Sequence, residues 1–469
     1  MSWEVRVIPN RYADSVRLMG VARAIRELDG VHACEALVGT AANLEQLAAL
    51  GATATATPGD IVIAVDGGDE SAERALEQAE QALAAADDGA GAARPAAVRP
   101  RSLPKAARGM DGANVALISV AGEYAVLEAH RALTEGMHVF LFSDHVPVED
   151  ELALKRRGAE LGLLVMGPEC GTAMLGGVGL GFANVVRPGS VGIVAAAGTG
   201  AQESACLLDA AGAGVSQIIG VGGRDLSAEV GGIMFRQAMA MLAEDADTDT
   251  LLLVSKPPAR EVVEALADAT PSGMQVVASF VGWDGGAAPF EIHPTLEAGA
   301  LAVAGAGAGR IDEDLGARRK LSAGRSLLGL YSGGTLAHEA ATIVDAAFGT
   351  AGSHRILDLG DEKYTRGRPH PMVDLSSRVE MLAEAARDDA VGSVLMDVVL
   401  GHGAHPDPAA ELAPAIERVS ERVAVVAHVC GTEADPQDAG RQAAALNEAG
   451  ALLAPSNAAA ARLAVELVR

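Results

Sequence analysis

The stretch Val191-Gly-Ile-Val-Ala-Ala-Ala-Gly198-Thr199-Gly200-Ala-Gln-Glu203 joins an apolar strand to a helix through a glycine turn. A second stretch, Leu327-Leu-Gly-Leu-Tyr-Ser332-Gly333-Gly334-Thr335-Leu-Ala-His338-Glu339, repeats this pattern. A strand that enters a helix through Gly and Thr points backbone N–H groups and the positive end of the helix dipole at one place, which suits an anion. We therefore expect the two turns to converge on one phosphate-like group.

The composition bounds the class of protein. The chain has 469 residues, enough for two to four domains, and its 49% hydrophobic and 3% aromatic content is typical of closely packed α/β layers. A net charge of -26 argues against nucleic-acid or anionic-membrane binding. The four cysteines lie far apart without CxxC pairs, and no apolar run approaches the roughly 18 residues that span a bilayer. We expect a soluble, cytoplasmic protein.

Strands and helices alternate along most of the chain, which predicts βαβ units on parallel sheets. The pattern divides into three α/β domains, at residues 1–188, 189–304 and 326–469, with a Gly-rich and then charged linker over 305–325. A basic loop rich in Pro, Ala and Gly at 87–112 interrupts the first domain. This loop is either an exposed linker or a segment that reaches an anionic ligand or a partner subunit.

Two further strand ends carry charged groups. Gly222, Gly223 and Arg224 follow one predicted strand, and Arg224 is either an anion clamp or half of a surface salt bridge. The stretch Arg366-Gly-Arg368-Pro-His370-Pro follows another. Proline on both sides of His370 stiffens that loop, and two arginines can hold a carboxylate or phosphate in bidentate fashion. The alternative for this loop is a structural turn or a subunit contact.

Neither a metal site nor a cysteine nucleophile is expected. His402 and His405 lie in a loop beside Asp397 and Asp407, but His-x-x-His without an organised third ligand is seldom a metal site. Cys170 follows a Pro turn with no nearby histidine to activate it, so we expect a packed or substrate-adjacent thiol.

The chain resembles the FdrA family, within the superfamily of the succinyl-CoA synthetases. The resemblance covers almost the whole chain. It implies a CoA-binding-like Rossmann domain over 1–188, then two flavodoxin-like ligase domains similar to the synthetase α and β subunits. The motifs that carry it are Ser119-Val-Ala-Gly-Glu-Tyr-Ala125, Leu164-Val-Met-Gly-Pro-Glu-Cys-Gly-Thr172, Gly220-Val-Gly-Gly-Arg-Asp-Leu-Ser227, Glu229-Val-Gly-Gly232, Val254-Ser-Lys-Pro-Pro258, Tyr331-Ser-Gly-Gly-Thr-Leu-Ala337 and Gly367-Arg-Pro-His-Pro-Met372.

The chain departs from the synthetases in ways that speak against CoA ligation. The region Ala278-Ser-Phe-Val-Gly-Trp-Asp-Gly-Gly286 has no histidine where the synthetases carry their phosphohistidine. The Gly-rich loop that holds CoA phosphates is missing between Val38 and Asp60, and no ATP-grasp domain is present. The sequence therefore indicates no definite cofactor and leaves open whether CoA or a nucleotide binds.

Resemblance to FdrA implies instead a carbamoyltransferase subunit of allantoin and purine breakdown. The reaction would be phosphorolysis of oxalurate, or a related ureido acid, to oxamate and carbamoyl phosphate, within a complex of companion subunits. The two glycine turns would bind phosphate or carbamoyl phosphate. Arg366 and Arg368 would hold a substrate carboxylate or assist the phosphate, and His370 would protonate the leaving amide nitrogen or tune the oxyanion. The alternatives are an NDP-forming acyl-CoA synthetase subunit and a non-catalytic scaffold.

Overall fold

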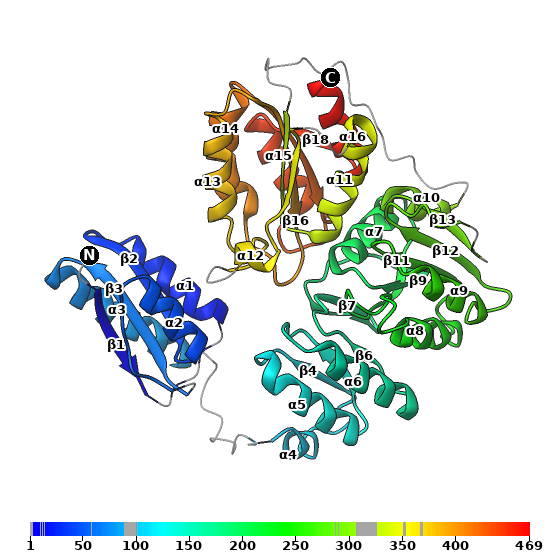
Figure 1. Cartoon of the computed structure of the whole chain (residues 1–469), viewed down its shortest axis with the longest axis horizontal. Helices are drawn as coiled ribbons and strands as arrows, with labels where there is room; N and C mark the ends of the chain where they lie inside the picture. The colour runs from blue at the N-terminus through cyan, green and yellow to red at the C-terminus, as the bar shows by residue number, and fades with distance from the viewer. Residues whose placement is uncertain are drawn as a thin grey trace. The chain divides into compact units, whose positions relative to one another are not determined.

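The computed structural model describes residues 3–9, 11, 13, 15–57, 59–88, 100, 102–286, 288, 290–305, 326–349, 353–365 and 369–469. The chain forms two compact units (Figure 1). One consists of Met1–Arg99 with Thr365–Pro369, and the other of Pro100–Tyr364 with His370–Arg469. In the described part of the chain, no helix combines the length and the apolar character needed to cross a membrane.

The N-terminal unit is built on a three-stranded antiparallel sheet. β1 (Trp3–Ile8) and β2 (Val31–Val38) lie on either side of β3 (Ile61–Gly67), and both run antiparallel to it. Side chains alternate along β3, so one face packs against α1 and α3 and the other against α2. These helices are α1 (Ser15–Arg26), α2 (Ala41–Ala49) and α3 (Asp69–Asp88).

The second unit begins with a small parallel sheet. Its strands are β4 (Val115–Ile118), β5 (His138–Leu141) and β6 (Val165–Met166), in that order. The buried faces of α5 and α6 share one hydrophobic cluster with the sheet, so they form its covering layer. The helices of this segment are α4 (Leu103–Ala107), α5 (Gly122–Thr134) and α6 (Val148–Leu161).

A seven-stranded sheet follows, in the order β13-β12-β11-β9-β10-β7-β8. Its first five strands are parallel, and the β7–β8 hairpin joins β10 in antiparallel fashion. The strands are β7 (Thr172–Leu175), β8 (Val178–Gly181), β9 (Pro188–Ala195), β10 (Val215–Gly220), β11 (Thr250–Ser255), β12 (Gln275–Phe280) and β13 (Glu291–His293). The helices are α7 (Gly198–Ala210), α8 (Ile233–Ala243), α9 (Arg260–Asp268) and α10 (Leu296–Ala304).

The C-terminal sheet has five parallel strands in the order β15-β14-β16-β17-β18. They are β14 (Ser326–Tyr331), β15 (Arg355–Asp358), β16 (Val391–Val399), β17 (Ala424–Cys430) and β18 (Leu452–Ala454). The helices are α11 (Gly334–Phe348), α12 (Glu362–Thr365), α13 (Ser376–Ala385), α14 (Pro408–Ser420), α15 (Ala439–Glu448) and α16 (Asn457–Val468).

A layer of four helices fills the space between the two larger sheets. α7 and α10 from one sheet and α11 and α16 from the other bury their apolar residues in a single core. On α11, Leu336, Ala340 and Val344 recur every four residues, which gives the continuous apolar stripe that such packing needs. This shared core fixes the position of α7 against α11.

The α/β class with parallel sheets is confirmed, but residues 1–188 do not form the single parallel domain expected from the sequence. Residues 1–99 are a separate unit with an antiparallel sheet. The order of strands and helices along the chain does not distinguish a parallel sheet from this one. In the structure β3 lies between β1 and β2 and runs antiparallel to both. Apart from Gly305, the linker expected at 305–325 lies outside the described residues. Residues 89–99 and 101 of the loop expected at 87–112 also lie outside them, and the described remainder includes the end of α3 and all of α4, so it is partly helical.

Candidate functional site

The two glycine turns are in direct contact. α7 starts at Gly198 after β9, and α11 starts at Gly334 after β14. The Thr335 amide donates to the Thr199 hydroxyl at 3.4 Å. A Cβ atom added to Gly333 would lie 2.9 Å from the Thr199 side chain, so only glycine allows this approach. The structure therefore brings together the two turns that the sequence analysis expected to converge.

Both helices begin without a side-chain cap. The positive ends of two helix dipoles, each equivalent to about half an elementary charge, therefore lie close to one another. An anion placed at this point would be stabilised by the remaining free N–H groups and would relieve the repulsion between the helices.

A buried carboxylate uses part of the second turn. Asp397, at the end of β16, accepts hydrogen bonds from the amides of Ser332 and Gly333, both at 2.8 Å, and from the Ser332 hydroxyl at 3.0 Å. Arg378, which is fully buried, forms an ion pair with Asp397 at 3.3 Å. These contacts hold the turn in place, so the amide of Gly334 rather than that of Ser332 is left for a ligand.

A lysine adds a positive charge beside the turns. Lys256 follows β11, and its Nζ lies 3.6 Å from the position that a Cβ atom on Gly334 would take. Lys256 forms no ion pair within 4.0 Å among the described residues. The nearby Asp358 is largely buried, which raises its pKa, while the Gly360 amide and the charge of Lys256 act in the opposite direction. The Lys256 ammonium therefore shares this place with the Asp358 carboxyl, and it adds a positive charge beside two uncapped helices.

His370 lies near the second turn, but its charge state differs from the expectation. Its Nε2 is 2.9 Å from the position of a Cβ atom on Gly360, and its ring lies 5.9 Å from that of Phe182. Burial lowers the pKa of His370 to about 4. Because Nδ1 accepts the Met372 amide at 3.3 Å, the neutral ring carries its proton on Nε2. At neutral pH His370 can donate a hydrogen bond but cannot serve as an imidazolium acid.

The arginines contribute less than the sequence suggested. Arg366 and Arg368 lie outside the described residues. Arg224 pairs with Glu151 at 2.8 Å and donates to the Val146 carbonyl at 2.8 Å, so the structure matches the salt-bridge alternative. Its neighbour Gly222 has φ +86°, and a Cβ atom there would meet the Pro168 carbonyl at 2.5 Å, whereas a Cβ atom on Gly223 would be in ordinary contact with the Ala196 carbonyl at 3.9 Å.

Arg224 belongs to a larger buried charge cluster. Glu151 also pairs with the fully buried Lys155 at 2.8 Å, and Lys155 pairs with Asp225 at 2.7 Å. Two cations and two carboxylates balance one another, and the Lys155 ammonium also donates to the Val221 carbonyl at 2.9 Å. The partners come from α6 and from the loop after β10, so this cluster joins the small sheet to the seven-stranded sheet.

The remaining candidates are packed or paired within the chain. Burial raises the pKa of the Cys170 thiol to about 12, and its sulfur donates to the carbonyls of Thr172 and Gly220. His405 pairs with Glu411 at 3.0 Å, and Asp407 pairs with Arg441 at 2.9 Å. No group of three or more His, Cys, Asp or Glu side chains is arranged for a metal in the described part of the chain.

Comparison with known proteins identifies the family. Three family models match: "AllF, heavy metal-associated domain" at 1–98, "CoA binding domain" at 186–280 and "CoA-ligase" at 330–467. The uncharacterized protein YahF of Escherichia coli K12 is 36% identical over 519 aligned positions, covering 100% of this chain and 99% of YahF. The chain belongs to the YahF family.

Other relatives of this YahF-family chain are CoA ligases. The succinate–CoA ligase subunit alpha 2 of Archaeoglobus fulgidus is 31% identical over 33% of the chain, and the malate–CoA ligase subunit alpha of Methylorubrum extorquens is 26% identical over 33%. Each match spans 54% of the relative's length. A solved acetyl-coenzyme A synthetase from Ca. Korarchaeum cryptofilum is 14% identical over 76% of this chain and 83% of its own, with a TM-score of 0.31.

These matches correct the activity expected from the sequence. The carbamoyltransferase of allantoin breakdown is contradicted, because the models that match 186–280 and 330–467 describe a CoA-binding domain and a CoA-ligase, and the partial relatives of this YahF-family chain named above are CoA ligases. The chain is succinyl-CoA synthetase-like. The CoA-binding model also matches 186–280, within the second predicted domain, whereas the sequence analysis had expected a CoA-binding-like fold over 1–188.

The heavy-metal-associated model does not come with a metal site. Residues 1–98 of this YahF-family chain contain a single cysteine, Cys34, and a single histidine, His32. Burial raises the pKa of the Cys34 thiol to about 12, so it stays protonated, whereas a metal ligand must be a thiolate. We assign no metal to this unit.

Sequence reasoning missed Lys256 and the role of Asp397. Lys256 stands in a Lys-Pro-Pro segment directly after a buried strand, and a cation at a strand end is a usable signal. Asp397 was considered only as a metal ligand. Its partners Ser332 and Gly333 are more than 60 positions away along the chain, so no local pattern could have revealed the contact.

Proposed function

We propose that this chain binds a phosphoryl group between the N-termini of α7 and α11 and acts as one subunit of an NDP-forming acyl-CoA ligase. The contact of Thr199 with Thr335, which joins two uncapped helix starts, carries the proposal. The ammonium of Lys256 beside Gly334 supports it independently. We also retain the FdrA assignment as a proposal for the chain's place within the family.

The chemistry calls for charge stabilisation rather than a side-chain nucleophile. In such a ligation a carboxylate takes a phosphoryl group to give an acyl phosphate, and the CoA thiol then displaces phosphate. Charge develops on the phosphoryl oxygens, where the backbone N–H groups of α7 and α11 and the Lys256 ammonium would bind them. His370, as a neutral hydrogen-bond donor, suits a substrate carbonyl or hydroxyl.

The substrates and partners follow from the relatives and from the sequence. The relatives are named for succinate, malate and sulfoacetate, so we propose a small carboxylic acid as substrate. The match of residues 186–280 to a CoA-binding domain supports CoA as the acceptor. We place the nucleotide on a companion subunit, because the sequence shows no ATP-grasp domain.

Phosphate binding tests the site directly. Isothermal titration of the purified chain with inorganic phosphate should give saturable binding, and the double variant Thr199→Val/Thr335→Val should bind about tenfold more weakly, as loss of one to two hydrogen bonds to a charged group implies. Thr270→Val is the matched control, because Thr270 lies just after α9 and its hydroxyl donates to the Leu266 carbonyl. Absence of phosphate binding by the unmodified chain, or equal binding by the double variant, would refute the site.

The ligase activity needs a separate measurement. With the companion subunit present, nucleotide hydrolysis that depends on both CoA and a dicarboxylate is the expected result, and Lys256→Met should lower its rate. Hydrolysis that ignores CoA would remove the ligase proposal while leaving phosphate binding intact.

A further inference from the structure

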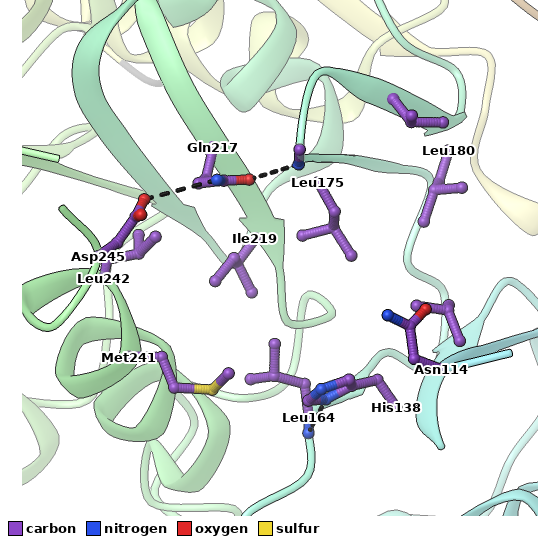
Figure 2. Close-up of a pocket in the computed structure, with 13 residues that line it drawn as sticks. Asn114, His138, Leu164, Leu175, Leu180, Gln217, Ile219, Met241, Leu242 and Asp245 are labelled. Atoms are coloured by element: carbon purple, nitrogen blue, oxygen red, sulfur yellow. Dashed lines mark hydrogen bonds between the residues drawn. The ribbon is translucent and has the colours of Figure 1, made fainter. Parts of the chain in front are cut away.

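A cavity lies between the small parallel sheet and the seven-stranded sheet, and none of the residues that line it belongs to the two glycine turns (Figure 2). Its volume is about 580 Å³. Its floor is apolar and deeply buried, formed by Leu164, Ile219 and Leu242, and its walls come from the hairpin and from α8, with Leu175, Leu180 and Met241. This volume falls in the range of small-molecule sites.

Two polar groups face this apolar space. Asn114, which is exposed, and His138, which is half-buried, both line the cavity, and Figure 2 shows the His138 ring beside the backbone of Leu164. The side chain of Asn114 has no hydrogen bond within the described residues. His138 Nδ1 accepts the Leu164 amide at 2.9 Å, so a neutral ring presents an N–H donor from Nε2. Burial lowers the pKa of His138, which keeps that ring neutral.

The other polar groups at the cavity are already satisfied. Gln217 accepts the Gly176 amide at 2.7 Å and donates to Asp245 at 3.5 Å. Asp245 also accepts the Thr248 hydroxyl at 2.7 Å. The described residues that line the cavity include no lysine or arginine, so among them a carboxylate or phosphate would find no counter-charge and would face Asp245. The lining therefore selects against anions.

We propose that this cavity is a binding site for an uncharged, mainly apolar small molecule that carries one hydrogen-bond acceptor. The apolar floor would receive its body, and Asn114 with His138 would bind the acceptor. Asn114, His138 and Leu164 lie at the amino ends of β4, β5 and β6. The phosphoryl site lies instead after the carboxyl ends of β9 and β14, so this inference does not depend on the proposed ligase function.

Nile red is a suitable probe because it is uncharged, apolar and has one carbonyl acceptor. Titration of the full chain should give saturable, one-to-one binding with a blue-shifted emission. Leu175→Trp, which fills the cavity from its wall, should weaken binding at least tenfold. Leu127→Trp is the matched control, because Leu127 is 55% exposed on α5 and does not line the cavity. If Leu175→Trp fails to fold by circular dichroism, Val178→Trp replaces it, since Val178 is 62% exposed at the rim.

A second comparison tests the polar end. Asn114→Leu should weaken Nile red binding about fivefold, but leave binding of N-phenyl-1-naphthylamine, an apolar probe without a carbonyl, unchanged. The proposal is overturned if the unmodified chain shows no saturable binding, or if Leu175→Trp binds like the control. It is also overturned if an anionic naphthalene sulfonate binds more tightly than Nile red, or if Leu175→Trp abolishes a dimer that covers the cavity.

Discussion

Glu203 and His428 form a buried ion pair that joins the two larger sheets, and its removal makes a sharp prediction. Glu203 on α7 and His428 on β17 are 1% and 4% exposed, and the Glu203 carboxylate lies 2.7 Å from His428 Nε2. His428 Nδ1 lies 3.1 Å from the Ala454 carbonyl. Both ring nitrogens face acceptors, so the ring is an imidazolium. Burial opposes its charge, but Glu203 outweighs burial and raises the pKa of His428. Burial likewise opposes the Glu203 charge, yet His428 lowers the pKa of Glu203.

Two substitutions at this pair should differ greatly in cost. His428→Leu leaves a buried carboxylate without its counter-ion and should reduce the free energy of unfolding by about 3–5 kcal/mol. Glu203→Gln should cost only about 1 kcal/mol, because a Gln amide can donate to a neutral His428 ring that still donates to Ala454. Equilibrium urea unfolding, followed by circular dichroism, measures both.

The pH dependence of this pair reverses in the Gln variant. In the unmodified chain the pKa of His428 is raised, so the stability that the pair contributes falls as pH rises above about 6.5. The pKa of Glu203 is lowered, so the same contribution also falls as pH drops below about 4.5. Without Glu203, burial alone lowers the His428 pKa, so this contribution should fall as pH drops below 6.5. Equal costs for the two variants, or an unchanged slope between pH 8 and 6 in Glu203→Gln, would refute the assignment.

Three further predictions concern other positions. In Gly333→Ala the added methyl group should push against Thr199 and separate the two turns, so phosphate binding measured by calorimetry should be more than tenfold weaker. Gly20→Ala is the control, because Gly20 has open space around it, and it should leave phosphate binding unchanged. Burial raises the pKa of Glu339 to about 7 from an ordinary 4.5, so the free energy of unfolding falls as pH rises from about 4.5 to 7. In urea unfolding, Glu339→Gln should therefore have a higher free energy of unfolding than the unmodified chain at pH 8 but not at pH 4.5. Lys155→Met leaves Glu151 with Arg224 as its ion-pair partner and leaves Asp225 with the backbone amides of Met234 and Phe235, so it should cost about 3–5 kcal/mol in the same assay.

The periodic pattern of apolar residues made most strands and helices of the chain predictable, and the glycine turns correctly predicted where α7 and α11 begin. What the sequence could not supply was strand direction and long-range pairing. β3 lies between β1 and β2 in the opposite direction, although its apolar run reads like any buried strand. The sequence left Arg224 as a candidate for binding an anion, because its partner Glu151 lies 73 positions earlier, on α6. Both outcomes depend on tertiary contacts, which no local pattern encodes.

The same two helices carry the proposed site and the network that holds it. Thr199 and Glu203 are four residues apart on α7, and Thr335 and Glu339 are four residues apart on α11, so each pair lies on one helix face. Asn457, fully buried at the start of α16, binds both glutamates, donating its amide N–H to Glu203 at 3.1 Å and its side-chain amide to Glu339 at 2.7 Å. Asn457 thus connects the second helical turn of α7 to the second helical turn of α11, while Thr199 and Thr335 are in contact in the first helical turns. The separation of the two positive helix ends is therefore set by a buried hydrogen-bond bridge rather than by the loops before them, which is the preorganisation that binding a charged group at this point requires.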